Sequence, residues 1–441
     1  MTSHSYPEYK DSKILWVGKI PAHWRLNRTK VLFELMKRPP RDQDEIVTAF
    51  RDGEVTLRNN RRTDGFTNAL QEIGYQGVRR GDLVIHAMDA FAGAIGVSDS
   101  HGKSTPVYSV CKPRVGVTNS WYYGRLLRHM ALSGYINSLA KGIRERSTEF
   151  RWAEAGNVYL PTPPLEEQNT IVAFLDRETG KIDALIAEQE KLLTLLAEKR
   201  QATISRAVSR GLDPDAPMKD SGVTWLGEVP EHWRVSPLKY LVSLRSGGTP
   251  SKENLDFWDG DVPWASAKDL KSERLADTID HITSFAVESG NATLVPPGTV
   301  LVVVRGMILA RIFPVVETVV PMAINQDLKG VIPLEGLNGK FLAWLLRGSA
   351  DESLRRLDEA GHGTKALRMD AWTSMQLPVP PVVEQTEIAA FLERETGKLD
   401  ALKAEAESAI DLLRERRSAL IAAAVTGKID VRNAVQQELA A

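Results

Sequence analysis

The sequence predicts an α+β protein with an internal pseudo-two-fold duplication. Two mixed α/β domains are separated by two long helices, which form an antiparallel coiled coil. Three observations predict it. Two blocks of sequence recur at offsets of 209 and 217 residues. Each second block runs into about 45 residues with an apolar stripe at helical spacing. Between the blocks, apolar runs of strand length precede one helical stretch. A period above 200 residues indicates a duplicated domain rather than a solenoid.

The first block, called here the opening block, begins each half of the chain. Residues 16–25, WVGKIPAHWR, recur as residues 225–234, WLGEVPEHWR. Each copy carries a histidine beside a tryptophan, at His23 and His232. The histidines of the chain are scattered without metal-ligand spacing. These two are therefore interpreted as capping or packing beside the tryptophan rather than as catalytic groups.

The second block, called here the tail block, closes each half. Residues 160–168, LPTPPLEEQ, recur as residues 377–385, LPVPPVVEQ. A further stretch follows in both copies, FLDRETGKIDAL in the first and FLERETGKLDAL in the second. The offset is larger for the tail block than for the opening block, so the length variation lies between the blocks. The blocks are therefore a constant frame around two divergent regions.

These blocks divide the chain into four parts. The first α/β domain takes residues 1–160 and the first helix residues 161–211. The second α/β domain takes residues 212–378, and the second helix with a C-terminal tail takes residues 379–441.

Each tail block is expected to start one long helix. A double proline followed by glutamate suits a helix start, and Gly211 and Gly427 follow the last apolar positions. A long helix with a single apolar stripe needs a partner. Equal length and equal pattern favour antiparallel pairing of the two helices with each other. The alternative is that each helix packs only on its own domain.

The divergent regions share an order of elements although their residues differ. Both read as two strand-forming stretches followed by an amphipathic helix. The ranges are 81–98, 106–117 and 120–140 in the first half, and 298–316, 322–334 and 339–358 in the second.

No candidate catalytic motif in the sequence has the residue spacing that its chemistry requires. Gly102-Lys103-Ser104 resembles the end of a phosphate-binding loop, but the required upstream glycine is one residue out of place. The chain lacks a methyl-transfer tetrad, a nuclease core and a metal-ligand cluster. The single cysteine, Cys111, excludes a disulfide framework and a cysteine-rich zinc site. We therefore expect no catalytic residue and no metal site in this chain.

Charge is unevenly distributed. The net charge is −1 for the whole chain, yet residues 1–160 carry +8 and residues 212–381 carry −5. The first domain could therefore meet phosphates, while the second could do so only locally. A solvated face is the alternative reading of each basic cluster. With no apolar N-terminal run and no apolar stretch longer than a strand, the expected location is the cytoplasm and no membrane contact is expected.

The paired opening and tail blocks resemble the specificity subunit of type I restriction-modification enzymes. The opening block reads W-x-G-x-I/V-P-x-H-W, and the tail block reads P-x-P-P-x-x-E-Q followed by F-L-x-R-E-T-G-K-x-D-A-L. Inside the second half, residues 246–270, 302–306 and 323–330 resemble the target-recognition domains of that family. The likeness covers essentially the whole chain.

The resemblance implies a role in DNA methylation and phage defence. Each α/β domain would be a target-recognition domain that reads one half of a bipartite, asymmetric site on double-stranded DNA. The helices would set the spacing and dock two methyltransferase (modification) subunits, through which restriction (motor-nuclease) subunits would join. The chain itself would be non-catalytic and hold no cofactor. AdoMet, ATP and Mg²⁺, with adenine-N6 methylation and DNA cleavage, would belong to the partner subunits.

The candidate DNA-binding residues are cations for phosphates and bidentate side chains for base edges. They lie in basic clusters, at strand ends, in a glycine-rich turn and just before each tail block. For the strand-end residues, a structural hydrogen bond within the domain is an equal alternative. The candidates are Arg58, Arg61, Arg62, His86, Asp89, Tyr108, Lys141, Arg144, Arg146, Arg151, Thr249, Lys268, Arg305, Asn325, Gln326, Lys365 and Arg368.

The helices supply the candidate subunit-interface residues, which are Leu185, Leu192, Leu193, Leu196, Leu402, Ile410 and Leu413. Two other functions stay open at this point: a coiled-coil scaffold without a DNA role, and a stand-alone enzyme with an unrecognised site. The two halves also differ, since the GGTPS segment at 247–251 has no counterpart in the first half. The two domains must then differ in fold detail and in the bases they would read.

Overall fold

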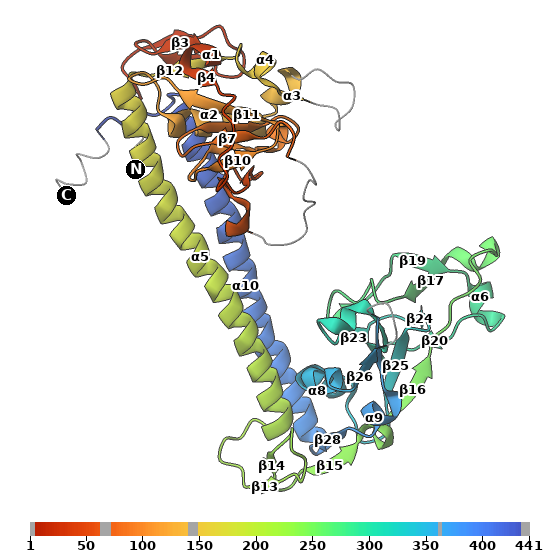
Figure 1. Cartoon of the computed structure of the whole chain (residues 1–441). Coiled ribbons are helices and arrows are strands. Elements are labelled where there is room, and N and C mark those ends of the chain that lie inside the picture. Colours follow the sequence, from red (N-terminus) through yellow and green to blue (C-terminus); the bar gives the residue numbers. More distant parts are fainter. Residues whose placement is uncertain (1–4, 62–71, 140–148, 360–363, 434–441) are drawn as a thin grey trace. The chain divides into compact units, whose positions relative to one another are not determined.

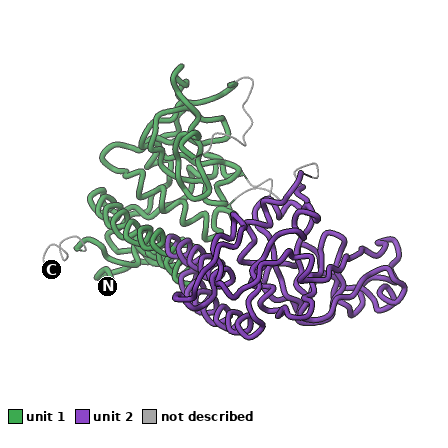
Figure 2. Tube along the Cα trace, turned by 90° about the horizontal axis from the view of Figure 1, so that it is seen from below, with its two compact units in different colours: residues 1–189, 408–441 green, residues 190–407 purple. Residues whose placement is uncertain are grey.

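A computed structural model describes residues 5–61, 72–139, 149–359 and 364–433 (Figure 1). The chain forms two compact units (Figure 2). Unit 1 combines residues 1–189 with 408–441, and unit 2 comprises residues 190–407. Each unit therefore contains one α/β domain and one half of each long helix.

The two long helices are α5 (Leu165–Arg210) and α10 (Val382–Val425). They have 46 and 44 residues, which correspond to rods of about 69 and 66 Å. Gly211 and Gly427 follow them with left-handed φ of +75°. Both helices thus have the bounds that the tail blocks predict. No helix in the described ranges combines the length and the apolar character that a membrane span requires.

The centre of unit 1 is an antiparallel sheet with strand order β4-β11-β8-β9. Helix α2 packs on it, and its buried Tyr122 and Tyr123 lie in one core with Leu83, Ile85 and Cys111. These strands and helices are β4 (Phe33–Leu35), β8 (Leu83–His86), β9 (Ile95–Val97), β11 (Tyr108–Pro113), α1 (Thr29–Leu32), α2 (Ser120–Leu132), α3 (Tyr135–Leu139) and α4 (Trp152–Ala155). Smaller pairs are β1 (Tyr9–Asp11) with β2 (Lys19–Pro21), β3 (Arg25–Arg28) with β12 (Tyr159–Thr162), β5 (Val47–Ala49) with β6 (Val55–Leu57), and β7 (Gln76–Val78) with β10 (Gly102–Ser104).

Unit 2 repeats this sheet with strand order β16-β25-β21-β23, extended by β18. Helix α7 takes the place of α2 on the sheet. The elements are β16 (Val242–Ser246), β18 (Arg274–Leu275), β21 (Val300–Val303), β23 (Val315–Thr318), β25 (Leu328–Pro333), α7 (Gly339–Gly348), α8 (Ala350–Leu354) and α9 (Met369–Thr373). The pairs β13 (Met218–Asp220) with β14 (Glu228–Pro230) and β15 (Arg234–Pro237) with β28 (Gln376–Val379) match β1 with β2 and β3 with β12. The predicted duplication of element order is confirmed.

Unit 2 also contains strands and a helix that are not matched by strands or helices in the described part of unit 1. A second sheet and a short helix are built mainly from the region around the GGTPS segment, and a three-stranded sheet lies near α9. They comprise β17 (Trp258–Ala265), β19 (Asp280–Ile282), β20 (Leu294–Val295), β24 (Met322–Ile324) and α6 (Ser284–Glu288), and then β22 (Arg305–Gly306), β26 (Leu357–Glu359) and β27 (Lys365–Leu367). The expected difference in fold detail is thus present.

The predicted single helices over 120–140 and 339–358 are wrong. The first ends at Leu132, and Gly134 with φ +81° separates it from α3. The second ends at Gly348, where the backbone leaves the helical region at Ser349 before α8 begins. The apolar periodicity continues through both breaks, so it could not reveal them.

The opening block holds the start of one long helix and the end of the other. In unit 1, Glu167 of α5 accepts hydrogen bonds from the indole of Trp24 (2.9 Å) and the hydroxyl of Tyr6 (2.6 Å), and His23 lies 2.8 Å away. Gly427, after α10, lies so close to Trp24 that a Cβ there would come within 2.9 Å of the ring. His23 is thus held beside Trp24 by the same carboxylate, in the kind of place that the structural interpretation expects.

Unit 2 repeats the arrangement with Glu384 of α10. The carboxylate accepts from the indole of Trp233 (3.0 Å) and lies 2.8 Å from His232. Gly211, after α5, approaches Trp233 as Gly427 approaches Trp24. The opening and tail blocks recur together because the tryptophan of each opening block donates a hydrogen bond to the glutamate of the tail block in the same unit.

The long helices run antiparallel. Asp183 pairs with Arg417 in unit 1 at 2.8 Å, and Arg200 pairs with Asp400 in unit 2 at 3.3 Å. Between the first pair and the second, the residue number rises from 183 to 200 on α5 and falls from 417 to 400 on α10. Asp400 and Arg417 also lie 217 residues after Asp183 and Arg200, so the same ion pair is made twice. The predicted antiparallel pairing is confirmed.

The candidate interface residues on these helices divide into two groups. Leu196 and Ile410 are buried, and Leu193 and Leu413 are half-buried. The remaining three are exposed by 41% to 52% of their surface and are Leu185, Leu192 and Leu402. The second group is therefore available to a partner.

Candidate nucleic-acid interface

In unit 1, the candidate residues meet at the edge where β8 ends and β11 begins. Tyr108 lies opposite His86 in the antiparallel register, and their rings meet edge to face with centroids 4.6 Å apart. The backbone N–H of Asp89 donates to Nδ1 of His86 at 2.9 Å. Three of the predicted residues thus form one cluster.

Burial sets the charge of this cluster. It lowers the pKa of His86, so the ring is neutral at pH 7 and, with Nδ1 accepting from Asp89, carries its proton on Nε2. Burial also raises the pKa of Tyr108, so its hydroxyl stays protonated. The cluster therefore offers neutral ring N–H and O–H groups, the kind that hydrogen-bond to base edges.

A hairpin that was not predicted covers this cluster. The β5–β6 turn brings Arg51 to Asp89 at 2.9 Å. Arg61 lies over the ring of Phe50, with 4.3 Å from its guanidinium carbon to the ring centroid, and pairs with Asp52 at 2.6 Å. Arg58, in the turn after β6, is close enough for its charge to act on Tyr108. The predicted Arg58 and Arg61 therefore lie at the same edge as His86.

The remaining candidates of the first half lie near this edge or outside the described residues. Arg151 directly follows Phe150, whose backbone N–H donates to the carbonyl of Ala87. Its guanidinium forms a double hydrogen bond with Glu149 at 2.5 and 3.0 Å. The candidates outside the described residues are Arg62, Lys141, Arg144 and Arg146.

In unit 2, the candidates gather at the edge where β21 and β24 end. The loop between β24 and β25 carries Asn325 and Gln326. Its Asp327 accepts a backbone hydrogen bond from Val304, directly before Arg305. Asn325 is only 7% exposed and accepts from the backbone N–H of Asp327, so its side chain holds the turn. Gln326 is exposed.

The glycine-rich turn reaches this edge because Gly247 lies against the end of β24. A Cβ at Gly247 would lie 2.1 Å from the carbonyl oxygen of Ile324, so only glycine fits. The contact places the hydroxyl of Thr249 in a hydrogen bond with Gln326. Trp264 donates to the carbonyl of Gly248 at 3.0 Å and fixes the turn. The predicted Thr249 is therefore beside the predicted Gln326.

The cations of this edge differ in how they are paired. Three of them already have carboxylate partners: Lys268 with Asp280, Lys365 with Glu359, and Arg368 with Asp358. Arg305 is exposed on β22, next to Ala366 and one pair from Lys365. Among the described residues it has no hydrogen-bond or ion-pair partner for its guanidinium. Arg305 is the cation best placed to contact a ligand.

The two edges are equivalent by their backbone hydrogen bonds. In unit 1 the N–H of Ala87 donates to Val107, and Phe150 donates to Ala87. In unit 2 the N–H of Val304 donates to Asp327, and Leu367 donates to Val304. This correspondence pairs Arg151 with Arg368, and Met88 with Arg305. One backbone arrangement thus presents different side chains in the two units.

Comparisons with known proteins find the chain similar to type I restriction-modification specificity proteins. The sequence model described as "Type I restriction modification DNA specificity domain" matches residues 230–410. The EcoR124I/EcoR124II specificity subunit of Escherichia coli is 30% identical over 271 residues, which is 59% of this chain and 61% of that relative. The putative MjaX specificity subunit of Methanocaldococcus jannaschii is 21% identical over 94% of this chain and 96% of its own length. The chain thus spans less than two thirds of the more similar relative.

Solved structures share the fold at low identity. One, described as the structural basis of complex assembly and conformational transition of the type I R-M system, covers 92% of this chain and 98% of its own. It has a TM-score of 0.69 at 16% identity. The HsdS subunit from Thermoanaerobacter tengcongensis gives 0.51 at 16% identity, covering 93% and 98%. The predicted fold class is confirmed.

Proposed function

We propose, from the premise that the chain belongs to the family of type I restriction-modification specificity subunits, that it reads a bipartite DNA site. The edge at His86 and Tyr108 reads one half, and the edge at Arg305 and Gln326 reads the other. The paired helices α5 and α10 hold the two readers and dock modification subunits. Methyl transfer with AdoMet, and cleavage with ATP and Mg²⁺ by restriction subunits, belong to partner chains.

One observation carries this proposal. The frame contacts are the same in both units, from Glu167 with Trp24 to Glu384 with Trp233. The equivalent strand edges carry different side chains, with Met88 in one and Arg305 in the other. A constant frame with two divergent edges is what two different half-sites on one DNA require. A scaffold without a DNA role gives no reason for that divergence.

The charge of each unit fits two modes of contact. The first domain is basic and supplies phosphate contacts itself, since cations on phosphates position a protein without reading sequence. The second domain is acidic, and most cations at its edge are already paired. Its reader therefore relies on Arg305, on Gln326 and on a basic partner subunit to close around DNA.

A domain exchange tests the proposed function. Residues 212–377 are replaced by the matching region of a relative with a different known target, and methylated adenines are mapped in cells that contain the modification subunit. We expect one half-site to change and the other to stay. An unaltered target would refute the assignment of the readers. Methyl transfer by the purified chain alone with AdoMet would instead favour the stand-alone enzyme.

Arg305→Ala should weaken binding to the cognate site by about 5- to 150-fold, which corresponds to about 1–3 kcal/mol for one bidentate contact. The reason is that Arg305 is exposed and unpartnered among the described residues. Binding is measured by fluorescence anisotropy of the assembled complex over a range of salt concentrations. The matched control is Arg234→Ala, at an exposed arginine on the frame strand β15. Equal affinities for the two variants would remove Arg305 from the interface.

A further inference from the structure

A cavity of about 400 Å³ lies between α2 and α10 in unit 1. Its lining includes three guanidinium groups, those of Arg125, Arg128 and Arg417. Leu132 and Ile421 supply apolar walls. Arg128 contacts the β5–β6 hairpin, but none of the residues that line the cavity is among those proposed to read DNA.

The three arginines are not equally neutralised. Arg125 pairs with Asp176, and Arg417 pairs with Asp183 at 2.8 Å. Arg128 donates only to the backbone carbonyl of Arg51, at 3.3 Å, and no carboxylate among the described residues lies within ion-pair distance of it. Its Nε is buried without a hydrogen-bond partner. Burial, together with the like charge of Arg417, lowers the pKa of Arg128. Arg128 thus lacks an ion-pair partner in the described part of the chain, although Glu415 lines the same cavity and the charge of Asp52 acts on Arg128.

The duplication identifies the counterparts of these arginines in unit 2. Asn119 and Asn338 cap α2 and α7, and each backbone N–H is held by the glutamine of the following tail block. Counting from these caps, Arg128 corresponds to Arg347. The repeat of the long helices makes Arg417 the counterpart of Arg200.

In unit 2 a carboxylate occupies the place between the two arginines. Glu273 forms an ion pair with Arg200 and lies 3.6 Å from Arg347. The carbonyl oxygen of Glu273 also accepts from Arg347 at 2.8 Å, as the carbonyl of Arg51 accepts from Arg128. Both arginines of unit 2 therefore hold an acid, whereas the matching position in unit 1 carries Arg51.

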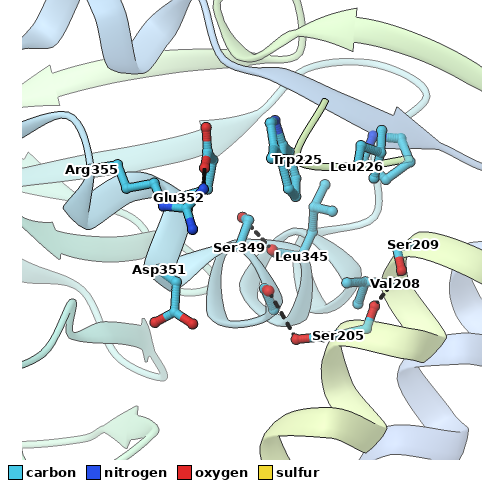
Figure 3. Close-up of a pocket in the computed structure, with 12 residues that line it drawn as sticks. Ser205, Val208, Ser209, Trp225, Leu226, Leu345, Ser349, Asp351, Glu352 and Arg355 are labelled. Carbon is cyan, nitrogen blue, oxygen red and sulfur yellow. Dashed lines mark hydrogen bonds and ion pairs between the residues drawn. The ribbon is translucent and has the colours of Figure 1, made fainter. Parts of the chain in front are cut away.

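Unit 2 has pockets in the corresponding region: one of about 370 Å³ is lined by Gly348 and Val208 (Figure 3), and one of about 650 Å³ is lined by Arg200 and Glu273. In unit 2, Gly348 lies against α5, where a Cβ would come within 2.5 Å of Val208. Ser205 donates to the carbonyl of Gly348 at 3.1 Å in the same contact (Figure 3). The corresponding residue in unit 1 is His129, whose side chain lines the cavity. A ring thus stands in unit 1 where unit 2 has a glycine, and the described lining residues of the unit 1 cavity include no counterpart of Glu273.

We propose that this cavity binds the carboxylate of an acidic side chain from a partner polypeptide, in the place that Glu273 fills within unit 2. A single carboxylate would give Arg128 the partner that Glu273 gives its counterpart Arg347. Glu415 at the rim is exposed and repels anions, a dianion such as phosphate more strongly than a single carboxylate. Leu132, which is 54% exposed at the rim, would cover the aliphatic part of a glutamate. This inference rests on the proposed function only where it names a modification subunit as the source of the acidic side chain.

The test uses the full chain without any partner, so its failure leaves the proposed function standing. The probe is N-acetyl-glutamate α-amide at constant ionic strength, and the neutral comparison is N-acetyl-glutamine α-amide. We expect the carboxylate probe to raise the thermal midpoint of unit 1 saturably, by about 2–4 °C. Arg128→Gln should abolish the rise, and Arg416→Gln, at an exposed arginine on α10, should keep it.

Three outcomes would overturn the proposal: no rise, an equal rise with the glutamine probe, or a larger rise with inorganic phosphate. A second variant guards against misfolding of Arg128→Gln. Arg51→Glu supplies a carboxylate from the position that matches Glu273, and Asp89→Asn is added so that the new carboxylate does not meet the one that Arg51 pairs with. The double variant should raise the midpoint without probe and remove the response to probe, and a response like that of the wild type would also overturn the proposal.

Discussion

Replacing Glu167 with alanine should lower the free energy of unfolding of unit 1 by about 3–5 kcal/mol. The carboxylate is 6% exposed and accepts hydrogen bonds from the buried Trp24 and Tyr6, with His23 at 2.8 Å. Without it, buried donors from two segments of the opening region lose their acceptor. The contact that fixes the start of α5 would be lost with them. Hydrogen exchange resolved by peptide measures the effect in unit 1 separately from unit 2.

Two matched variants calibrate this expectation. Glu166→Ala removes the neighbouring, exposed carboxylate and should leave exchange in unit 1 unchanged. Glu384→Ala should destabilise unit 2 by less, because Glu384 is more exposed and holds only Trp233 and His232. Equal effects of Glu167→Ala and Glu166→Ala would show that the frame does not depend on this carboxylate.

On the proposed function, in which two modification subunits dock on the paired helices, changing Leu185 and Leu412 together to lysine should remove one of them. Both leucines are exposed and lie in unit 1, and the ion pair of Asp183 with Arg417 sets a register in which they are about one turn apart. Their repeat counterparts in unit 2 are Leu402 and Leu195, which are also exposed. Exposed leucines that recur with the duplication suit two copies of one partner. Native mass spectrometry measures the stoichiometry.

The two units give this experiment its internal control. Lysine at Leu195 and Leu402 should remove the other subunit, and lysine at all four positions should remove both, with an affinity loss above about 100-fold per site. Circular dichroism should remain unchanged because none of the four side chains is buried. Two subunits still bound to the fourfold variant would place docking elsewhere on the molecule.

The paired helices and the blocks that hold them could be predicted because the sequence contains both blocks twice. Identical spacing in the two copies indicated the paired helices, and the antiparallel ion pairs of Asp183 and Arg200 bear that out. The helix breaks after Leu132 and Gly348 were missed, since the apolar period continues across them. A local turn leaves little trace in a pattern that reports only which face is buried.

The candidate interface was predictable in position rather than in detail. The expected strand ends indicated His86, Tyr108 and Arg305. His86 and Tyr108 lie opposite each other at the sheet edge of unit 1, and Arg305 lies at the equivalent edge of unit 2. The pairing of Lys365 with Glu359 could not be foreseen, because side-chain partners are fixed by the fold around them. The hairpin carrying Phe50 and Arg51 was missed for the same reason. Its only signal was a short Arg-Asp-Gly turn between two strand-like runs.

The discontinuous make-up of unit 1 has a consequence for synthesis. Its α/β domain leaves the ribosome first, yet the end of α10, with Ala424 and Val425 in the same core, is made last. Unit 2 is one continuous segment, and its chain is finished before the end of α10 is made. Domains generally fold as units during translation. The α/β domain of unit 1 is thus completed only after unit 2 has been made, and a stop codon before Ala424 would remove part of its core.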